Sequence, residues 1–255
     1  MSRLFARLFR YLTALALALV FWQSLILIFR VPSYILPTAY TVAVELVSRF
    51  QFLSGHFATT FYETAVGAIV GISAGVVAGG CLAFFRHARW IGEPYLIALQ
   101  SFPREALAPL LVVWFGFGYA PKIIMSSLIC FCPMAISSVA TFSITPREMV
   151  DLLRAQGATR SQIFWYIRIP YAIPSLVAAL RVALPLAVIG AVIGEFIGGS
   201  SGLGYVIATE SAHANTALVL AAIVLLALLG TSLTGLVSIV TAIAQRRFVL
   251  HLEGV

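Results

Sequence analysis

Six long runs of apolar residues divide the chain, and polar and charged residues gather between them. A helix needs about 20 apolar residues to cross the hydrocarbon layer of a bilayer, and each run is close to or above that length. The pattern therefore predicts an all-α integral membrane protein in which residues 1–255 form a single transmembrane domain. The predicted spans are about 11–29, 57–85, 94–115, 123–142, 173–197 and 216–244.

The second predicted span carries a glycine at every fourth position, namely Gly67, Gly71, Gly75 and Gly79. Residues four apart lie on one face of a helix, so these glycines form a strip without side chains. Small residues at this spacing let the backbone of a neighbouring helix approach closely in lipid. The strip predicts close helix packing and does not by itself indicate a function.

Polar residues and helix-capping patterns occupy the stretch between the fourth and fifth predicted spans. Thr145–Glu148 has the pattern of a capping box with proline at the first helical position, and Gly157 can take the left-handed conformation that ends a helix. Thr159 and Gln162 give a second capping box, and Pro170 is expected to stop the helix that follows. The pattern predicts two short helices that meet at an angle at the membrane face. An amphipathic pair resting in the headgroup layer and a docking element for a cytoplasmic partner are both consistent with it.

The charged residues are few and lie mainly on one side of the predicted spans. They make up 10% of the chain, against 61% hydrophobic residues, whereas a soluble domain carries about 25% charge. With the amino terminus inside, eleven of the 16 Arg and Lys residues fall on the inner side, three on the outer side and two within spans. This bias predicts that both termini face the cytoplasm, and it relates the net charge of +7 to the membrane and not to nucleic acid. The first span lacks a cleavage pattern and is predicted to be an uncleaved anchor.

The sequence contains no motif for ATP binding, metal binding or catalysis. It contains no Gly-x-x-x-x-Gly-Lys-Ser/Thr phosphate loop, and its only lysine is Lys122. Cys130-x-Cys132 lacks the spaced Cys or His partners of a metal site, and the four histidines are scattered. We therefore expect that this chain binds no metal ion or cofactor and is not an enzyme.

The stretch after the fourth span resembles the cytoplasmic loop of permease subunits in binding-protein-dependent ABC importers. That family's motif is Glu-Ala-Ala, three residues, Gly, nine residues and Ile-x-Leu-Pro. Here Asp151 stands at the glutamate position, Gly157 is the glycine, and Ile167-Arg168-Ile169-Pro170 follows after nine residues. Leu152 and Leu153 replace the two alanines, and Ile169 replaces the leucine. This sequence therefore keeps the spacing of the family motif but differs from it at these apolar positions.

Two further segments resemble the nitrate, sulfonate, taurine and pyrimidine-precursor branch of that family. Ala108–Gly118 is similar to the ending of its third span, and Glu195–Tyr205 is similar to the exit of its fifth span. The resemblance implies a type I ABC importer permease with six transmembrane helices and a coupling helix in the cytoplasmic loop 145–170. The residues that it implies for coupling to the ATPase are Asp151, Arg154, Gly157, Ala158, Arg160 and Pro170.

The same resemblance implies partners. They are a second permease copy that shares the pathway, two cytoplasmic ATP-binding subunits that hold ATP and Mg, and a solute-binding protein outside the membrane. The expected location is the bacterial inner membrane, and the expected cargo is a small polar or anionic solute of the sulfonate, taurine, nitrate or pyrimidine-precursor class.

Three charged residues within the predicted spans are candidates for the translocation pathway. Arg104 and Glu105 lie in the middle of the third span, which Pro103 and Pro109 interrupt. A charge at the bilayer centre costs about 2.5–3.5 kcal/mol on insertion scales, so it needs a partner, a wet cavity or an interface. Broken helices with polar residues at mid-depth often form transport sites. Glu195, near the outer end of the fifth span, is the third candidate, either as part of an outer gate or as a residue at the interface.

Two other classes of protein fit parts of the pattern. A self-sufficient secondary transporter or channel is the main alternative, although the six spans carry few titratable groups for a proton relay. A membrane-embedded enzyme or scaffold is the third. Co-purification of an ATPase with the chain would distinguish an importer subunit from both of these alternative classes.

Overall fold

The computed structural model describes residues 2–252, and the elements in that range are all helical. In order they are α1 Ser2–Phe29, α2 Ala39–Ser48, α3 Phe50–Phe84, α4 Arg86–Ser101, the 3-10 helix η1 Arg104–Leu107, α5 Ala108–Phe115, α6 Tyr119–Ser143, α7 Arg147–Ala155, α8 Arg160–Ile163, the π-helical turn η2 Phe164–Arg168, α9 Ile169–Gly198, α10 Leu203–Ala212 and α11 Thr216–Leu252.

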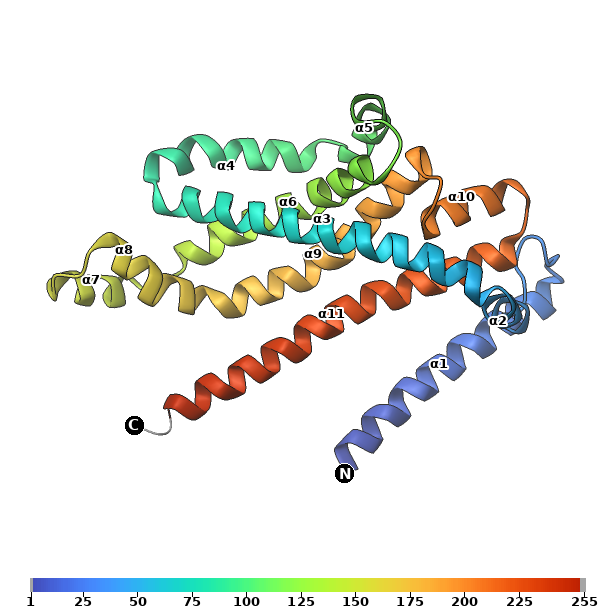
Figure 1. Cartoon of the computed structure of the whole chain (residues 1–255). Helices are drawn as coiled ribbons and strands as arrows, with labels where there is room; N and C mark the ends of the chain where they lie inside the picture. The colour runs from blue at the N-terminus through green and yellow to red at the C-terminus, as the bar shows by residue number, and fades with distance from the viewer. Residues whose placement is uncertain (1, 253–255) are drawn as a thin grey trace.

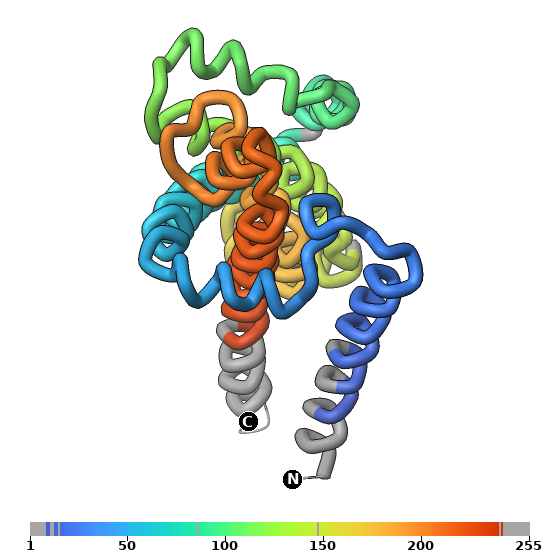
Figure 2. The backbone as a smooth tube through the Cα atoms, turned by 90° about the vertical axis from the view of Figure 1, so that its right-hand side faces the viewer, coloured from blue at the N-terminus to red at the C-terminus, as the bar shows by residue number. Residues whose placement is uncertain are grey.

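The long helices α3, α6, α9 and α11 run the length of the bundle, with α3 inclined across α9 and α11; α7 and α8 lie at one end and α2 and α10 at the other (Figure 1). α6 lies between α3 and α9 and packs along both of them. α11 packs against α9, α10 and α2. Figure 2 shows α1 apart from this bundle, and its Trp22 packs against the cluster where α2, α10 and α11 meet. The two ends of the bundle therefore carry different structures, and each is a candidate site.

The glycine strip of α3 lies against α6. A Cβ added to Gly71 would lie 2.4 Å from the Ser127 carbonyl oxygen, and one added to Gly79 would lie 2.6 Å from the Ala135 carbonyl oxygen. Real Cβ atoms do not approach backbone atoms this closely, so the α6 backbone occupies the space that side chains would fill. The Ser127 hydroxyl also donates to the Gly67 carbonyl at 3.0 Å. Glycine at these positions is what permits the close approach of α3 and α6.

The contacts between α3 and α6 keep one register along the whole strip. Each helix presents every fourth residue to the other, as expected when the ridges of residues four apart pack together. The pairs in contact are Gly67 with Ser126, Gly71 with Cys130, Gly75 with Met134 and Gly79 with Ser138.

The described residues hold four helices that are long and apolar enough to cross a membrane: Phe50–Phe84, Tyr119–Ser143, Arg160–Gly198 and Thr216–Ile239. They correspond to the second, fourth, fifth and sixth predicted spans. The side chains of α1 are described without a gap only over Ala16–Phe29, and this apolar stretch alone is shorter than the length of a span. By length and composition alone, the structure therefore supports four spans, or five when the bent pair described next is counted as one.

The third predicted span, 94–115, is not one straight helix. His87–Ser101 and Arg104–Phe115 are bent by 80° at the break between them. Pro103 has no N–H to donate, and the residue before a proline is pushed out of the helical region. Phe102 accordingly has φ −75° and ψ 133°, which is extended backbone.

The fifth predicted span starts earlier than expected, and the expectation that Pro170 stops a helix is wrong. α8, the π-helical turn and α9 form one continuous helix from Arg160 to Gly198. At the π-helical turn the Ile169 N–H donates to the Phe164 carbonyl, five residues back. This wider turn directly precedes Pro170, whose ring would crowd a regular α-helical turn and whose nitrogen cannot donate.

Candidate functional site

The end of α7 forms a tight turn around Gly157, which has φ +85°. The Ala158 N–H donates to the Leu153 carbonyl at 3.0 Å, and the Gly157 N–H donates to the Arg154 carbonyl at 2.9 Å. These two bonds define the Schellman motif, which satisfies carbonyls at a helix end and needs a left-handed residue. A Cβ at Gly157 would meet no atom within 4 Å, so a substitution there acts on the backbone conformation and not through crowding.

The next helix begins with the predicted capping box. The Gln162 N–H donates to Thr159 Oγ1 at 3.3 Å, and the Thr159 N–H donates to Gln162 Oε1 at 2.8 Å. A glycine-ended helix followed directly by a doubly capped helix start fixes the angle between α7 and α8. The end of the bundle opposite α2 and α10 therefore carries a rigid bend (Figure 1).

The first capping box predicted from sequence does not form. α7 begins one residue later than expected, with Pro146 as its N-cap and no side-chain hydrogen bond at that cap. Thr145 is buried, and its hydroxyl has no hydrogen-bond partner among the described residues. Because the Val150 N–H already donates to the Pro146 carbonyl, at 3.4 Å, the first turn of α7 starts from Pro146.

The residues predicted to couple this turn to a partner all lie at this end of the bundle. Asp151 and Arg154 are exposed and form an ion pair of 3.3 Å on α7. Arg160 is exposed at the start of α8, Ala158 is half-buried in the turn, and Pro170 is exposed in the first turn of α9. The structure brings them together on the surface, and their role in coupling stays a prediction.

The opposite end of the bundle holds a buried ion pair that was not predicted. Lys122 was counted from sequence among the charges on the outer side, but its side chain is 2% exposed in the first turn of α6. Its Nζ atom lies 2.8 Å from Oε1 of Glu63, whose side chain is fully buried on α3. Lys122 also donates to the Ser201 carbonyl at 3.1 Å. A sequence signal did exist, because Glu63 stands four residues before Gly67 and so continues the glycine strip.

Glu195 lies next to this ion pair and is also buried. Thr60 Oγ1 donates to Glu195 Oε1 at 2.6 Å, and the Gly204 N–H donates to Glu195 Oε2 at 2.5 Å. The Leu203 N–H donates back to Thr60 Oγ1 at 2.8 Å. A Cβ at Gly202, which has φ +109°, would overlap the Glu195 carboxylate. The turn between α9 and α10 is thus folded over Glu195, and α3, α6 and α9 hold it together.

Arg104 lies at the break between α4 and α5 and reaches α6. Its Nη1 atom donates to the Ile129 carbonyl at 3.1 Å and to the Leu128 carbonyl at 3.4 Å. Pro133 is four residues after Ile129 and has no N–H, so it leaves that carbonyl without its helical partner. Arg104 supplies the missing donor. Glu105 is exposed beside it, and the prediction that both residues line a pathway stays untested.

We expect Arg104→Met to lower the free energy of unfolding by about 1–3 kcal/mol, because it leaves a buried carbonyl without a donor. In a Pro133→Ala background the alanine N–H can donate to Ile129, so the same Arg104 change should have a smaller effect there. Unfolding of the full chain in mixed micelles by increasing SDS measures both effects in a double-mutant cycle. Equal losses in the two backgrounds would show that Arg104 does not compensate for Pro133.

The described part of the chain has no group of three or more His, Cys, Asp or Glu side chains that could hold a metal ion. Cys130 and Cys132 are buried and Cys81 is exposed, and all three are free thiols.

Comparison with known proteins identifies the family. Residues 71–248 match the profile of the family described as the binding-protein-dependent transport system inner membrane component, and this match covers more than half of the chain. The chain belongs to this family. It is therefore a transmembrane permease of the ABC transporter class, and the expected resemblance is confirmed.

Individual relatives match the permease over most of its length. It is 33% identical over 220 residues to a probable ABC transporter permease protein of Haemophilus influenzae, covering 86% of this chain and 90% of that protein. It is 34% identical over 223 residues to the riboflavin transport system permease protein RibX of Chloroflexus aurantiacus, covering 86% and 82%. It is 27% identical over 218 residues to the putative aliphatic sulfonates transport permease protein SsuC of Bacillus subtilis, covering 84% and 79%.

A solved structure supports the fold of the permease. A chain of the MetNI methionine ABC transporter, in an inward-facing conformation, aligns with a TM-score of 0.62 and covers 76% of this chain and 98% of that chain. The two share 22% sequence identity, so this likeness concerns the fold alone.

Proposed function

We propose that the permease crosses the bacterial inner membrane six times and works with a second copy to enclose one pathway. The four long helices, the bent α4–α5 pair and the apolar part of α1 would supply the six crossings. Large apolar side chains such as Val113, Ile69 and Val182 are exposed on the outside of the bundle, as lipid contact requires. Residues 11–29 would form one of these crossings.

The end with α7 and α8 is proposed to face the cytoplasm. Arg89, Arg154, Arg160 and Arg168 lie toward that end, in keeping with the excess of positive charge on cytoplasmic loops. Figure 1 shows that α1 begins and α11 ends away from the end that carries α2 and α10. Both termini of the permease would then lie in the cytoplasm, and α2 and α10 would face the solute-binding protein outside.

The bend around Gly157 is proposed as the coupling element for a separate ATP-binding subunit, with two such subunits per permease dimer. ATP and Mg²⁺ would be held by those subunits. The permease has no phosphate loop, and its only lysine is already buried against Glu63. The single observation that carries this proposal is the rigid, capped bend exposed between two long spans in a chain of this family.

The proposed cargo is a small polar or anionic solute, of the sulfonate, taurine, nitrate or pyrimidine-precursor class. Relatives named for aliphatic sulfonates, formylaminopyrimidine and taurine support this class, whereas RibX, which has a higher identity to this chain, is named for riboflavin. Arg104 and Glu105 are proposed to face the pathway at the break of the bent pair. Glu195 is proposed to act at the outer end of the pathway, by holding the turn between α9 and α10. Identifying the compound that the partner binding protein retains on purification would decide among these solutes.

Gly157→Val is expected to reduce solute-stimulated ATP hydrolysis about tenfold or more in vesicles that hold the permease with its ATPase and binding protein. A β-branched residue resists φ +85°, at a cost of about 1–3 kcal/mol, so the end of α7 must change its direction. Gly157→Asn is the matched control, because asparagine tolerates the left-handed region, and it should keep most of the activity. Membrane insertion should be unchanged in both variants. Full coupling in the valine variant would refute the proposed role of the bend.

A further inference from the structure

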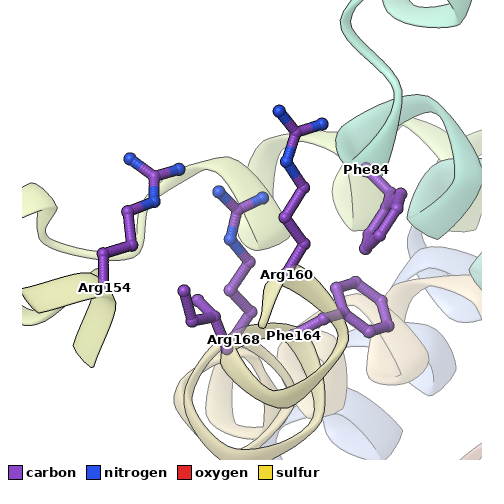
Figure 3. Close-up of a pocket in the computed structure, with 6 residues that line it drawn as sticks. Phe84, Arg154, Arg160, Phe164 and Arg168 are labelled. Carbon is purple, nitrogen blue, oxygen red and sulfur yellow. The ribbon is translucent and has the colours of Figure 1, made fainter. Parts of the chain in front are cut away.

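Three arginine side chains border a pocket of ≈ 110 Å³ beside the bend. Arg154 comes from α7, Arg160 from the start of α8 and Arg168 from the π-helical turn (Figure 3). In Figure 3 their guanidinium groups point the same way, and Phe84 and Phe164 lie beside Arg160. Phe84 ends α3, so the pocket joins three separate parts of the chain.

The positive charge of this pocket is only partly compensated within the permease. Arg154 pairs with Asp151 at 3.3 Å, but this pair is exposed and weak. Among the side chains that the structure describes, no ion pair includes Arg160 or Arg168. Arginine guanidinium groups bind phosphate oxygens through paired N–H donors. The pocket is therefore suited to an anion that bears a phosphate group.

The side chains around this pocket are of the kinds found at the level of lipid headgroups. Phe84 and Phe164 contact each other edge to face, with ring centroids 5.5 Å apart, and Phe164 also contacts Phe142. Trp165 and Tyr166, on the adjoining turn, are 63% and 75% exposed. Trp and Tyr side chains gather where the hydrocarbon layer meets the headgroups. Arg168 directly precedes α9, the apolar part of the continuous helix that begins at Arg160, so its charge lies where that apolar part begins.

We propose that the pocket formed by Arg154, Arg160 and Arg168 binds the phosphate of an anionic phospholipid in the cytoplasmic leaflet. Basic pockets between membrane helices on the cytoplasmic side are typical sites for anionic headgroups. The apolar lining of Phe84, Ile163 and Phe164 lies next to Trp165, whose exposed ring contacts Phe164 and can be covered by acyl chains. An acidic side chain of a protein partner would satisfy the arginines but would leave this aromatic surface uncovered, which favours the lipid.

The bound lipid would stabilise the bend. It would link the end of α3 to α7 and to the start of the α8–α9 helix. The turn at Gly157 joins α7 to that helix along the chain. Anionic lipid would then hold the coupling element at one angle, and a bilayer without anionic lipid would leave it less restrained. This inference rests on the proposed orientation of this end toward the cytoplasm, but it concerns the isolated permease and does not depend on the proposed ATPase.

Native mass spectrometry of the delipidated full-length permease, titrated with phosphatidylglycerol or phosphatidylcholine, tests the site. We expect tighter binding of phosphatidylglycerol, and about fivefold weaker binding in each of the variants Arg160→Gln and Arg168→Gln, from the usual contribution of one arginine near an anionic surface. Arg89→Gln is the matched control. It removes one arginine near the same end, but Arg89 does not line the pocket and pairs with Glu93 at 3.0 Å, so lipid binding should not change.

Three results would overturn the inference. Unchanged phosphatidylglycerol binding in both variants would show that the lipid binds elsewhere. Thermal stabilisation by millimolar inorganic phosphate, equal to that by phosphatidylglycerol and lost in the same variants, would assign the pocket to free phosphate. No preference between the two lipids, together with loss of a co-purifying ATPase in the variants, would assign it to a protein partner.

Discussion

Lys122→Met is expected to lower the free energy of unfolding of the permease by about 3–5 kcal/mol, because it leaves Glu63 buried without its ion-pair partner. Methionine keeps most of the length and volume of the lysine side chain, so the loss reflects charge more than packing. The change also removes the hydrogen bond to the Ser201 carbonyl, which holds the turn before α10. Unfolding of the full chain in mixed micelles by increasing SDS measures the loss.

Two further variants test whether that loss comes from breaking a buried ion pair. Glu63→Met combined with Lys122→Met replaces the whole pair with apolar side chains and should recover most of the lost stability. Arg49→Met breaks the Glu45–Arg49 ion pair, whose N–O distance is 3.0 Å but which is partly exposed. This change should lower the free energy of unfolding by less than about 1 kcal/mol. If Lys122→Met unfolds at the wild-type SDS concentration, the pair is not buried in the bilayer-embedded protein.

Gly71→Ala is expected to cost about 3 kcal/mol, at the upper end of the range for overpacked sites. The new methyl group would lie 2.4 Å from the Ser127 carbonyl oxygen and 2.8 Å from Ser127 Cα, and these backbone atoms can move only if α3 and α6 separate. Gly55→Ala is the matched control on the same helix, because its Cβ would meet nothing within 4 Å. There the better helix propensity of alanine should raise stability by up to about 1 kcal/mol.

The two glycine variants are compared by the same SDS unfolding measurement. Opposite signs for Gly71→Ala and Gly55→Ala would support a close contact between α3 and α6 that is confined to the glycine strip. Equal effects would contradict the packing described above, because they would mean that neither position touches another helix.

Patterns within one element were predictable from sequence because they depend on neighbouring residues. The capping box at Thr159 and Gln162 and the left-handed Gly157 are both present as expected. The first capping box failed for a reason that local sequence does not reveal, since Thr145 is buried by tertiary packing and Pro146 takes the N-cap position. Pro170 does not end a helix, because the π-helical turn before it makes room for the proline ring in a continuous helix.

The polar network at the end that carries α2 and α10 was missed because it depends on contacts between distant segments. Glu63 and Lys122 are 59 residues apart, and Thr60 and Glu195 are 135 residues apart. Each helix does show a ladder of residues four apart, with Glu63 leading the glycines on α3 and Lys122 leading Ser126 and Cys130 on α6. Neither ladder by itself predicts that α3 and α6 pack in the register that brings Glu63 to Lys122.

The sequence by itself determined the helical membrane class, the close-packing face of α3, the charge asymmetry and the family motif around Gly157. These properties follow from composition and from spacing along one helix, which tertiary packing does not alter. Tertiary structure alone decided that Lys122 pairs with Glu63, that Arg104 donates to a carbonyl freed by Pro133, and that arginines of α7 and of the α8–α9 helix share one pocket. Each of these depends on the register between helices, and that register is set by how their surfaces fit in three dimensions.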